Sequence, residues 1–337
     1  MLEKPNLSDE QLYKCLLANY DLTVTALQFL QLGNDSNGWV YRVATADQTY
    51  FLKVKKPATV TRASVRLPHY LRQQGISQIV APIETQSHTL WADVEKFHIV
   101  VYPFIEGADG MTVGLSDSHW IEYGAILRAL HTAPLTPELH TILPKENFQS
   151  KWLAVVADLQ QRVTAGTWAN ELEHELAEFW IEKQPVIDRI VSRTHELGDQ
   201  LSNISAEFVI CHADIHTANI LVANDGGLHV VDWDDPILAP KERDLMFVNG
   251  AAVGSPTKTR QEALFFQGYG SNNIDLLILA YYRYEWVVAD MGGYGERVLV
   301  MNDVGAVTKR QAVEGFKFLF APGNVVDVAD QSDATLN

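Results

Sequence analysis

Hydrophobic positions in the N-terminal part of the chain recur in short runs with turn residues between them. The runs LQFLQL, WVYRVAT and TYFLKV fall between residues 27 and 54, and the stretches GNDSNG and ADQ separate them. This alternation predicts an antiparallel series of hairpins. Residues 59–75 then predict a helix that Pro68 distorts or restarts, and two further strand-like runs follow, QIVAPIE and KFHIVVYPFIEG. We therefore expect a small sheet that carries one helix.

After Gly107 the hydrophobic positions follow the period of helices. The first helical segment opens at Ser116 or Asp117, both good N-cap residues, and ends at His131. Further helices are predicted over residues 151–164, 169–199, 259–269, 274–290 and 309–319. The sequence thus predicts an α+β fold of two lobes. A small antiparallel-sheet lobe covers residues 1–105, and a larger, mainly helical lobe covers residues 106–337.

Polar residues gather abruptly between residues 212 and 235, directly after an apolar run that leads into CHADI. The next two runs, ANILVAND and LHVVDW, predict the strands of a hairpin with a turn at residues 224–227. In that hairpin Asp232, at the end of the second strand, returns beside Asn219 at the start of the first. Asp214, Asn219 and Asp232 are therefore expected to converge.

Three converging oxygen donors of this kind suit phosphoryl transfer. A carboxylate and an amide oxygen on neighbouring strands, here Asp232 and Asn219, suit Mg²⁺, which binds few protein oxygens together with phosphate and water. Asp214 precedes Asn219 by five residues and is expected near the metal but not bound to it. There it could accept a proton from a hydroxyl group that attacks a phosphate.

Composition and charge narrow the classes of partner. The chain is 47% hydrophobic and 20% charged, its two cysteines make no disulfide framework, and no apolar run nears the roughly 18–20 residues that cross a bilayer. Without a leader-like segment, these features predict a cytoplasmic protein with no membrane partner. The net charge is −16, so nucleic acid is not expected as a partner. Residues 106–337 carry 33 Asp and Glu against 16 Lys and Arg, which would attract a cationic small molecule but also fits a solubilising surface.

The motif His212-x-Asp214-x₄-Asn219, with Asp232 thirteen residues later, is similar to the catalytic and metal-binding loops of the protein-kinase-like superfamily. It resembles most the aminoglycoside phosphotransferase family, as do the stretches YFLKV, VVYPFIEG, YGAILRALH and PKERDLMFV. The likeness covers nearly the whole chain. It implies a two-lobed, kinase-like enzyme that uses ATP or GTP with Mg²⁺ to phosphorylate a hydroxyl group, with Asp214 as the base and Asn219 and Asp232 as metal ligands.

The resemblance also implies which residues bind the nucleotide. Lys53, at the end of a strand, would bind the α and β phosphates. Ser36, in the loop GNDSNG, would help to hold phosphate oxygens together with backbone N–H groups. The carbonyl of Pro103 and the N–H of Ile105 would bind the adenine.

The expected acceptor is an aminoglycoside or a spectinomycin-like aminocyclitol, which would make the protein an antibiotic-resistance enzyme. Asp234 and Asp235, together with Tyr281 and Glu285 at helical spacing, offer carboxylates and an aromatic face to a cationic acceptor. A place in the helix core is an equal alternative for the aromatic residues. The alternative functions are a metabolic kinase for a choline-like or sugar-like alcohol, and a pseudokinase that only binds nucleotide.

His212 and His216 also allow a second interpretation, a metal-binding hydrolase site that includes His229. This interpretation leaves Asn219, Asp232 and Lys53 without a function. The resemblance instead implies that His212 supports the loop through hydrogen bonds to the backbone.

The segment after Lys53 departs from the kinase pattern. Active kinases hold the phosphate-binding lysine with a glutamate from the helix of the N-terminal lobe. Between Lys53 and Glu84 the sequence has no Asp or Glu, and Arg62 falls near the expected position. Three explanations are open: an acid from elsewhere takes this role, the additional cations bind a more anionic donor, or catalysis is impaired. The intact catalytic loop favours a rearranged but active site.

Overall fold

The computed structural model describes residues 2–32, 37–248 and 259–336. The chain forms two compact units. The first contains Met1–Pro144 and His212–Ile237, and the second contains Lys145–Cys211 and Leu238–Asn337. The polar segment 212–235 thus belongs to the same unit as the N-terminal sheet, and the units do not follow the predicted boundary after residue 105.

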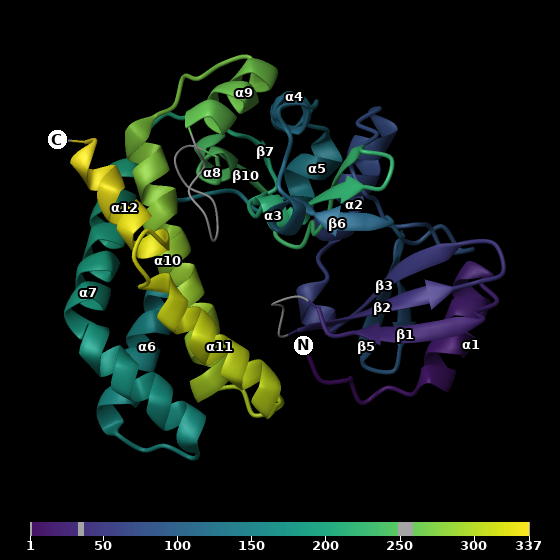
Figure 1. The fold of residues 1–337 in the computed structure, drawn as a ribbon, viewed down its shortest axis with the longest axis horizontal. Coiled ribbons are helices and arrows are strands. Elements are labelled where there is room, and N and C mark those ends of the chain that lie inside the picture. Colours follow the sequence, from purple (N-terminus) through teal and green to yellow (C-terminus); the bar gives the residue numbers. More distant parts are fainter. Residues whose placement is uncertain (1, 33–36, 249–258, 337) are drawn as a thin grey trace. The chain divides into compact units, whose positions relative to one another are not determined.

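The first unit is built on a five-stranded antiparallel sheet with the strand order β1-β2-β3-β5-β4 (Figure 1). Its strands are β1 (Ala26–Leu30), β2 (Gly38–Ala44), β3 (Thr49–Lys55), β4 (Ala92–Val94) and β5 (Phe97–Pro103). Strands β2 and β3 pair along their whole length, from Gly38 opposite Lys55 to Ala44 opposite Thr49. The predicted series of hairpins is confirmed.

Helix α1 (Asp9–Tyr20) packs beside β4. It begins after Ser8, whose side chain forms a capping box with that of Gln11. At its end the buried Tyr20 donates its hydroxyl proton to the carbonyl of Ile99 in β5, at 2.9 Å. The two ends of the helix are therefore fixed by different means, a local cap and a bond to the sheet.

Helix α2 (Arg62–Gln73) supplies the side chain of Val65 to a core cluster with Leu90 and Val100. Fully burying side chains of this size contributes about 1.5–3 kcal/mol each. The helix runs without interruption through Pro68, which is buried. The helix therefore does not end and restart at this proline, as the sequence suggested it could.

The sequence pattern predicted a strand for QIVAPIE, residues 78–84, and this prediction is wrong. This segment has only an isolated bridge between Ile79 and Val230. Pro82 has no N–H group and cannot take its place in a hydrogen-bonded ladder, so a continuous strand does not form. The additional strand of the sheet is β4, which the sequence pattern did not predict.

A three-stranded sheet with the order β6-β8-β9 carries the segment after His212. Its strands are β6 (Gly107–Asp109), β8 (Ile220–Ala223) and β9 (Leu228–Val230). Leu221 lies opposite His229, so the predicted hairpin is confirmed, and its second strand ends two residues before Asp232. The helices that complete this unit are η1 (Pro57–Thr59), α3 (Gly110–Val113), α4 (Asp117–His131), α5 (Pro137–Ile142) and η2 (Thr217–Asn219).

The second unit is mainly helical (Figure 1). Its helices are α6 (Trp152–Ala165), α7 (Glu171–Leu201), α8 (Glu242–Leu245), α9 (Thr259–Tyr269), α10 (Leu276–Leu299), α11 (Ala306–Leu319) and α12 (Val325–Ala334). Strands β7 (Val209–Cys211) and β10 (Ile237–Ala239) form a two-stranded sheet. Helices α7 and α11 meet where the ring of Trp180 stacks on that of Phe316, with centroids 5.1 Å apart. The predicted α+β class, a small antiparallel sheet followed by a larger helical part, is confirmed.

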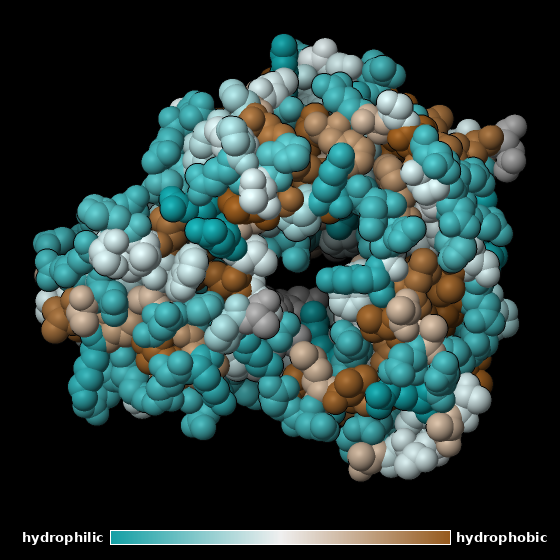
Figure 2. Space-filling model, turned by 180° about the vertical axis from the view of Figure 1, so that it is seen from behind, coloured by the Kyte–Doolittle hydropathy of each residue, from teal (hydrophilic) through white to brown (hydrophobic). Residues whose placement is uncertain are grey.

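The visible surface is mostly hydrophilic. Figure 2 shows hydrophilic residues over most of the face seen there, with hydrophobic residues in smaller groups. In the parts of the chain that the structure describes, none of the helices combines the length and the apolar character needed to span a membrane.

Candidate active site

The loop that begins at His212 is held by the imidazole ring of this residue. The ring is fully buried and lies against Trp233, with ring centroids 4.4 Å apart. The backbone N–H of Asp214 donates to Nδ1 at 3.2 Å, and Nε2 contacts the carbonyl of Val231 at 2.9 Å. Because Nδ1 accepts, the ring proton lies on Nε2, which donates to Val231. His212 therefore ties the Asp214 loop to the residue before Asp232, and the predicted backbone support is confirmed.

The carboxylate of Asp214 accepts a hydrogen bond from Asn219 and contacts the ring of His216. The side-chain nitrogen of Asn219 donates to Oδ2 at 3.0 Å and to the Asp214 carbonyl at 2.7 Å. Nε2 of His216 lies 3.3 Å from Oδ1, while Nδ1 of the same ring accepts the N–H of Ala218 at 3.2 Å. Burial lowers the pKa of His216 to about 4. The Asp214 side chain remains 36% exposed, so an incoming hydroxyl group can reach it.

Asp232 lies beside Asn219. The N–H of Val231 donates to the Asn219 carbonyl at 3.0 Å, which places the next residue, Asp232, next to the start of β8. Asp232 has a φ of 65°, in the left-handed region that Asp adopts more readily than most residues. The expected neighbourhood of Asp214, Asn219 and Asp232 is therefore observed, whereas their individual roles stay predictions.

Lys53 joins this group from β3. It forms an ion pair with Asp232, and its Nζ lies 3.4 Å from each carboxylate oxygen of Asp234. Lys55 donates to Oδ2 of Asp234 at 2.6 Å. Burial lowers the pKa of Lys53, but Asp232 and Asp234 outweigh this effect and raise it well above its usual value.

The same ion pair determines the charge of Asp232. Burial is the largest single effect and raises the pKa of this carboxyl group, but Lys53, Lys55 and a hydrogen bond with Asp234 together outweigh it and lower the pKa to about 2. The Asp232 side chain is 42% exposed, and the neighbouring ammonium groups together overcome its desolvation. Asp232 is therefore a carboxylate throughout the physiological pH range.

The segment expected to bind adenine lies at the end of β5. The carbonyl of Val101 accepts the N–H of Ile83 at 2.8 Å, on the side of β5 that faces away from β3. Alternate residues of a strand direct their backbone groups to the same side, so the carbonyl of Pro103 also points away from β3. This orientation suits the predicted role of Pro103. Ile105 follows in the loop and is half-buried, and Ser36 lies outside the described residues.

The residues expected to bind the acceptor lie in different surroundings. Asp235 is exposed in the first unit. Tyr281, in the second unit, is 1% exposed, and its ring packs edge to face against Phe148 at 5.4 Å. Glu285 accepts the hydroxyl proton of Ser150 at 3.0 Å and is 15% exposed. The position of Tyr281 fits the helix-core alternative. Asp235 keeps an exposed carboxylate, whereas the second oxygen of Glu285 lies 3.7 Å from Nη1 of Arg243.

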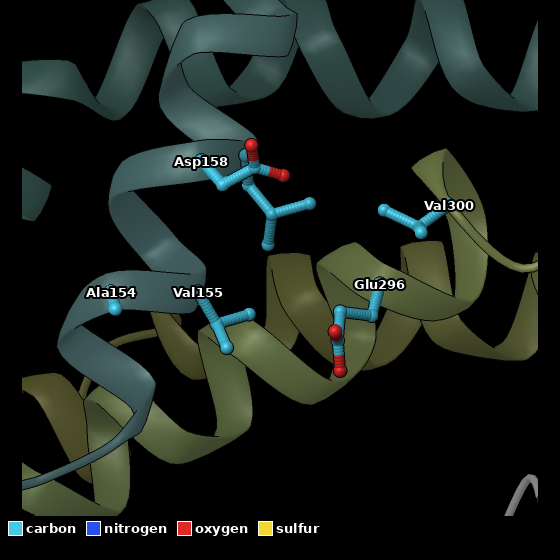
Figure 3. A pocket seen from close by; sticks show the side chains of 6 residues that line it. Ala154, Val155, Asp158, Glu296 and Val300 are labelled. Atoms are coloured by element: carbon cyan, nitrogen blue, oxygen red, sulfur yellow. The ribbon is translucent and has the colours of Figure 1, made fainter.

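Two hollows of the second unit lie apart from these candidates. One, of about 260 Å³, lies between α6 and α10, and Figure 3 shows the carboxylates of Asp158 and Glu296 at its wall. Asp158 forms an ion pair there with Arg162 at 2.9 Å. The other, of about 370 Å³, is lined by residues of the 204–209 segment and the start of α10. Neither is lined by a residue that the sequence predicts for catalysis or binding.

The sequence did not predict the contact of Lys55 with Asp234 or that of His216 with Asp214. A signal for Lys55 was present, because two lysines separated by one residue on a strand share one face of the sheet. For His216 the sequence offered only the motif HADIH, which does not distinguish a ligand of a metal from a donor to a neighbouring carboxylate. Both residues contact members of the predicted site.

The comparison with known families decides the class of the protein. Residues 28–282 match the phosphotransferase enzyme family (APH). The chain belongs to this family. The protein is accordingly a phosphotransferase that acts on hydroxyl groups, and the family expected from the sequence is confirmed.

Similar solved structures support the assignment. The structure of this family member is similar to that of spectinomycin phosphotransferase APH(9)-Ia in complex with ADP and spectinomycin, with a TM-score of 0.87 and 31% identity over 98% of this chain and 99% of that chain. Choline kinase LicA from Streptococcus pneumoniae shares the fold, with a TM-score of 0.58 and 15% identity over 92% of this chain and 99% of that chain. The predicted kinase-like architecture is confirmed.

A relative is also found by sequence. The chain is 22% identical to Protein StrN of Streptomyces griseus over 293 residues, which cover 82% of this chain and 81% of that protein. The match therefore extends over most of both chains.

Proposed function

We propose that the protein transfers the γ-phosphoryl group of ATP or GTP to a hydroxyl group of a spectinomycin-like aminocyclitol or aminoglycoside antibiotic, with Mg²⁺ as cofactor. The observation that carries this proposal is the meeting of Asp214, Asn219, Asp232 and Lys53 in one unit of a phosphotransferase. Such an activity would make the protein an antibiotic-resistance enzyme.

Asp214 acts as the base. Asn219 donates to its Oδ2 at 3.0 Å, and the ring of His216 lies against the other oxygen, with Nε2 3.3 Å from Oδ1. These contacts fix its orientation before the acceptor arrives, so little reorganisation is needed when it accepts the hydroxyl proton. The partial exposure of the side chain leaves room for the acceptor.

Asn219 and Asp232 fit a divalent cation. The nitrogen of the Asn219 amide faces Asp214, so the amide oxygen is directed elsewhere and can serve as a ligand. Asp232 is ionised and 42% exposed, which suits a carboxylate ligand. When bound, Mg²⁺ would neutralise charge on the phosphates.

Lys53 binds the phosphates of the nucleotide. Its side chain is 13% exposed, on the same side of β3 as Lys55. A fixed ammonium group at this place lowers the repulsion between the phosphates and the carboxylates of the loop. The Pro103 carbonyl and the Ile105 N–H supply hydrogen-bond groups for the base of the nucleotide.

The acceptor class is supported by sequence similarity and charge. The structure with 31% identity contains spectinomycin, whereas the similarity to choline kinase LicA is limited to the fold. Asp235 is an exposed carboxylate of the first unit that can contact an ammonium group of a cationic acceptor, and the role of Glu285 stays a prediction from the sequence. The excess of acidic residues beyond residue 105 points the same way.

A direct assay tests the proposal. The protein is incubated with Mg²⁺ and ATP or GTP against spectinomycin, several aminoglycosides and simple amino alcohols, and mass spectrometry detects an added phosphate. We expect phosphorylation of spectinomycin or a related aminocyclitol. Transfer to choline-like alcohols alone would establish the metabolic alternative, and nucleotide binding without transfer would establish a pseudokinase.

A further inference from the structure

Helix α2 of the first unit provides no acidic partner for Lys53. Helix α2 has the sequence RASVRLPHYLRQ, which contains arginines and one histidine but no Asp or Glu. The first acid after it, Glu84, contacts His88 at 2.8 Å and His69 at 3.4 Å. An acid from another part of the chain must therefore balance the lysine.

Asp234 makes the contacts that such an acid requires. Its Oδ2 accepts from Lys55 at 2.6 Å, and both of its oxygens lie 3.4 Å from Nζ of Lys53. The side chains of Lys53 and Lys55 are 13% and 5% exposed. A buried ammonium group is strongly unfavourable without an opposite charge, so the carboxylate of Asp234 holds both lysines in place.

Asp232 cannot fill this role alone. In the proposed function it binds Mg²⁺, so its negative charge is shared between the ion and Lys53. Asp234 lies two residues further on. Between them Trp233 is 2% exposed and packs on His212, which fixes the positions of both carboxylates.

We propose that Asp234 is a positioning residue that replaces the missing helix glutamate and holds Lys53 and Lys55 as a pair of ammonium groups for the nucleotide phosphates. The inference rests on the proposed function and deepens it, because it adds Lys55 as a second phosphate-binding cation. It also differs from the acceptor-binding role that the sequence suggested for Asp234. Without Asp234, Asp232 alone balances Lys53, and the lysine then competes more strongly with Mg²⁺ for that carboxylate.

Steady-state kinetics distinguish these roles. The variants are Asp234→Asn, Asp234→Glu and, as a matched control, Asp47→Asn, which removes the same charge from an exposed turn of the same unit. For Asp234→Asn we expect kcat to fall at least about tenfold and the half-saturating Mg²⁺ concentration to rise, with the acceptor KM within about threefold of the wild type. Asp47→Asn should behave as the wild type. A rise of the acceptor KM with unchanged kcat would instead make Asp234 an acceptor ligand and overturn the inference, as would unchanged kinetics with a lower melting temperature.

Calorimetry separates this inference from the proposed function. Binding of ADP with Mg²⁺ needs no acceptor, so it can be measured even if the wild type phosphorylates none of the compounds tested. Asp234→Glu keeps the charge that balances the lysines and therefore protects the fold if Asp234→Asn does not fold. We expect ADP–Mg²⁺ binding to weaken several-fold in each Asp234 variant that folds, and less for ADP without Mg²⁺. Equal affinity in the wild type and in Asp234→Glu and Asp234→Asn would overturn the inference.

Discussion

Nε2 of His216 lies 3.3 Å from Oδ1 of Asp214, and this contact determines how the base is presented. The N–H of Ala218 donates to Nδ1 of the same ring, so the ring proton lies on Nε2, the nitrogen that contacts the carboxylate. Burial lowers the pKa of His216 to about 4, so the ring is neutral at physiological pH. His216 therefore orients Asp214 without adding a charge to the site.

Replacing His216 tests this orientation. His216→Phe keeps a ring but removes both nitrogens, the one that accepts from Ala218 and the one that contacts Asp214, and we expect kcat to fall about tenfold with little change in the KM of either substrate. His216→Gln offers an amide N–H in a similar place and should recover part of the loss. His195→Gln, on the exposed side of α7, is the control. Equal kcat values for His216→Phe and the wild type would exclude a positioning role.

Asp214→Asn should affect the chemical step alone. The amide is of the same size and can still accept from Asn219, but it cannot take up a proton. We expect kcat to fall by roughly 10²- to 10⁴-fold while the affinity for ADP with Mg²⁺ remains near that of the wild type. Steady-state kinetics measure kcat, and calorimetry on the same preparation measures the affinity for ADP with Mg²⁺. Undiminished turnover in this variant would show that another group is the base.

The part of the site that is local in the sequence could be predicted. Asp214 and Asn219 belong to one loop, and the turn at 224–227 returns the chain to Asn219 after a strand of four residues. Spacing and turn chemistry determine such contacts. Helix α4 was predictable for the same reason, because Ser116 caps it locally.

The contacts that join distant segments could not be predicted. Lys55 and Asp234 are 179 residues apart, and nothing in the local pattern selects Asp234 among the 42 acidic residues of the chain. Tyr281 was assigned to the acceptor because helical spacing shows which residues share a face but not what covers that face. Helix α1 was missed although Ser8 and Gln11 carry the sequence of a capping box.

Asp290, on α10, should make the stability of the second unit depend on pH. Burial raises its pKa from 3.8 to about 7, while Arg297 opposes the shift and Glu285 adds to it. Between about pH 4 and 7 the folded state then holds a proton that the unfolded state has lost, so stability falls as the pH rises. The total loss is about 4 kcal/mol at most, since each pKa unit corresponds to about 1.4 kcal/mol.

Asp290→Asn should remove most of this decline. The variant stays neutral at every pH, so its melting temperature should exceed that of the wild type at pH 8, and the two should converge near pH 4 to 5. A series of calorimetric scans between these values measures the difference. Parallel curves for the two proteins would show that Asp290 ionises normally in the folded state.

Two helical glycines allow a prediction about the segment that contacts Glu285. A Cβ atom on Gly198 in α7 would lie 2.4 Å from the carbonyl oxygen of Phe148, whereas one on Gly293 in α10 would meet nothing within 4 Å. Alanine favours a helix over glycine by about 1 kcal/mol, so Gly293→Ala should be neutral or stabilising.

In Gly198→Ala this gain is outweighed, because the clash is with backbone and overpacking costs typically about 1–3 kcal/mol. We expect a lower melting temperature for Gly198→Ala and an equal or higher one for Gly293→Ala. Because Phe148 precedes Ser150, which donates to Glu285, the displaced segment should also raise the KM of a cationic acceptor while the KM for ATP stays unchanged. A melting temperature for Gly198→Ala at or above that of Gly293→Ala would show that the 148–150 segment moves without cost, and an unchanged acceptor KM would separate Glu285 from acceptor binding.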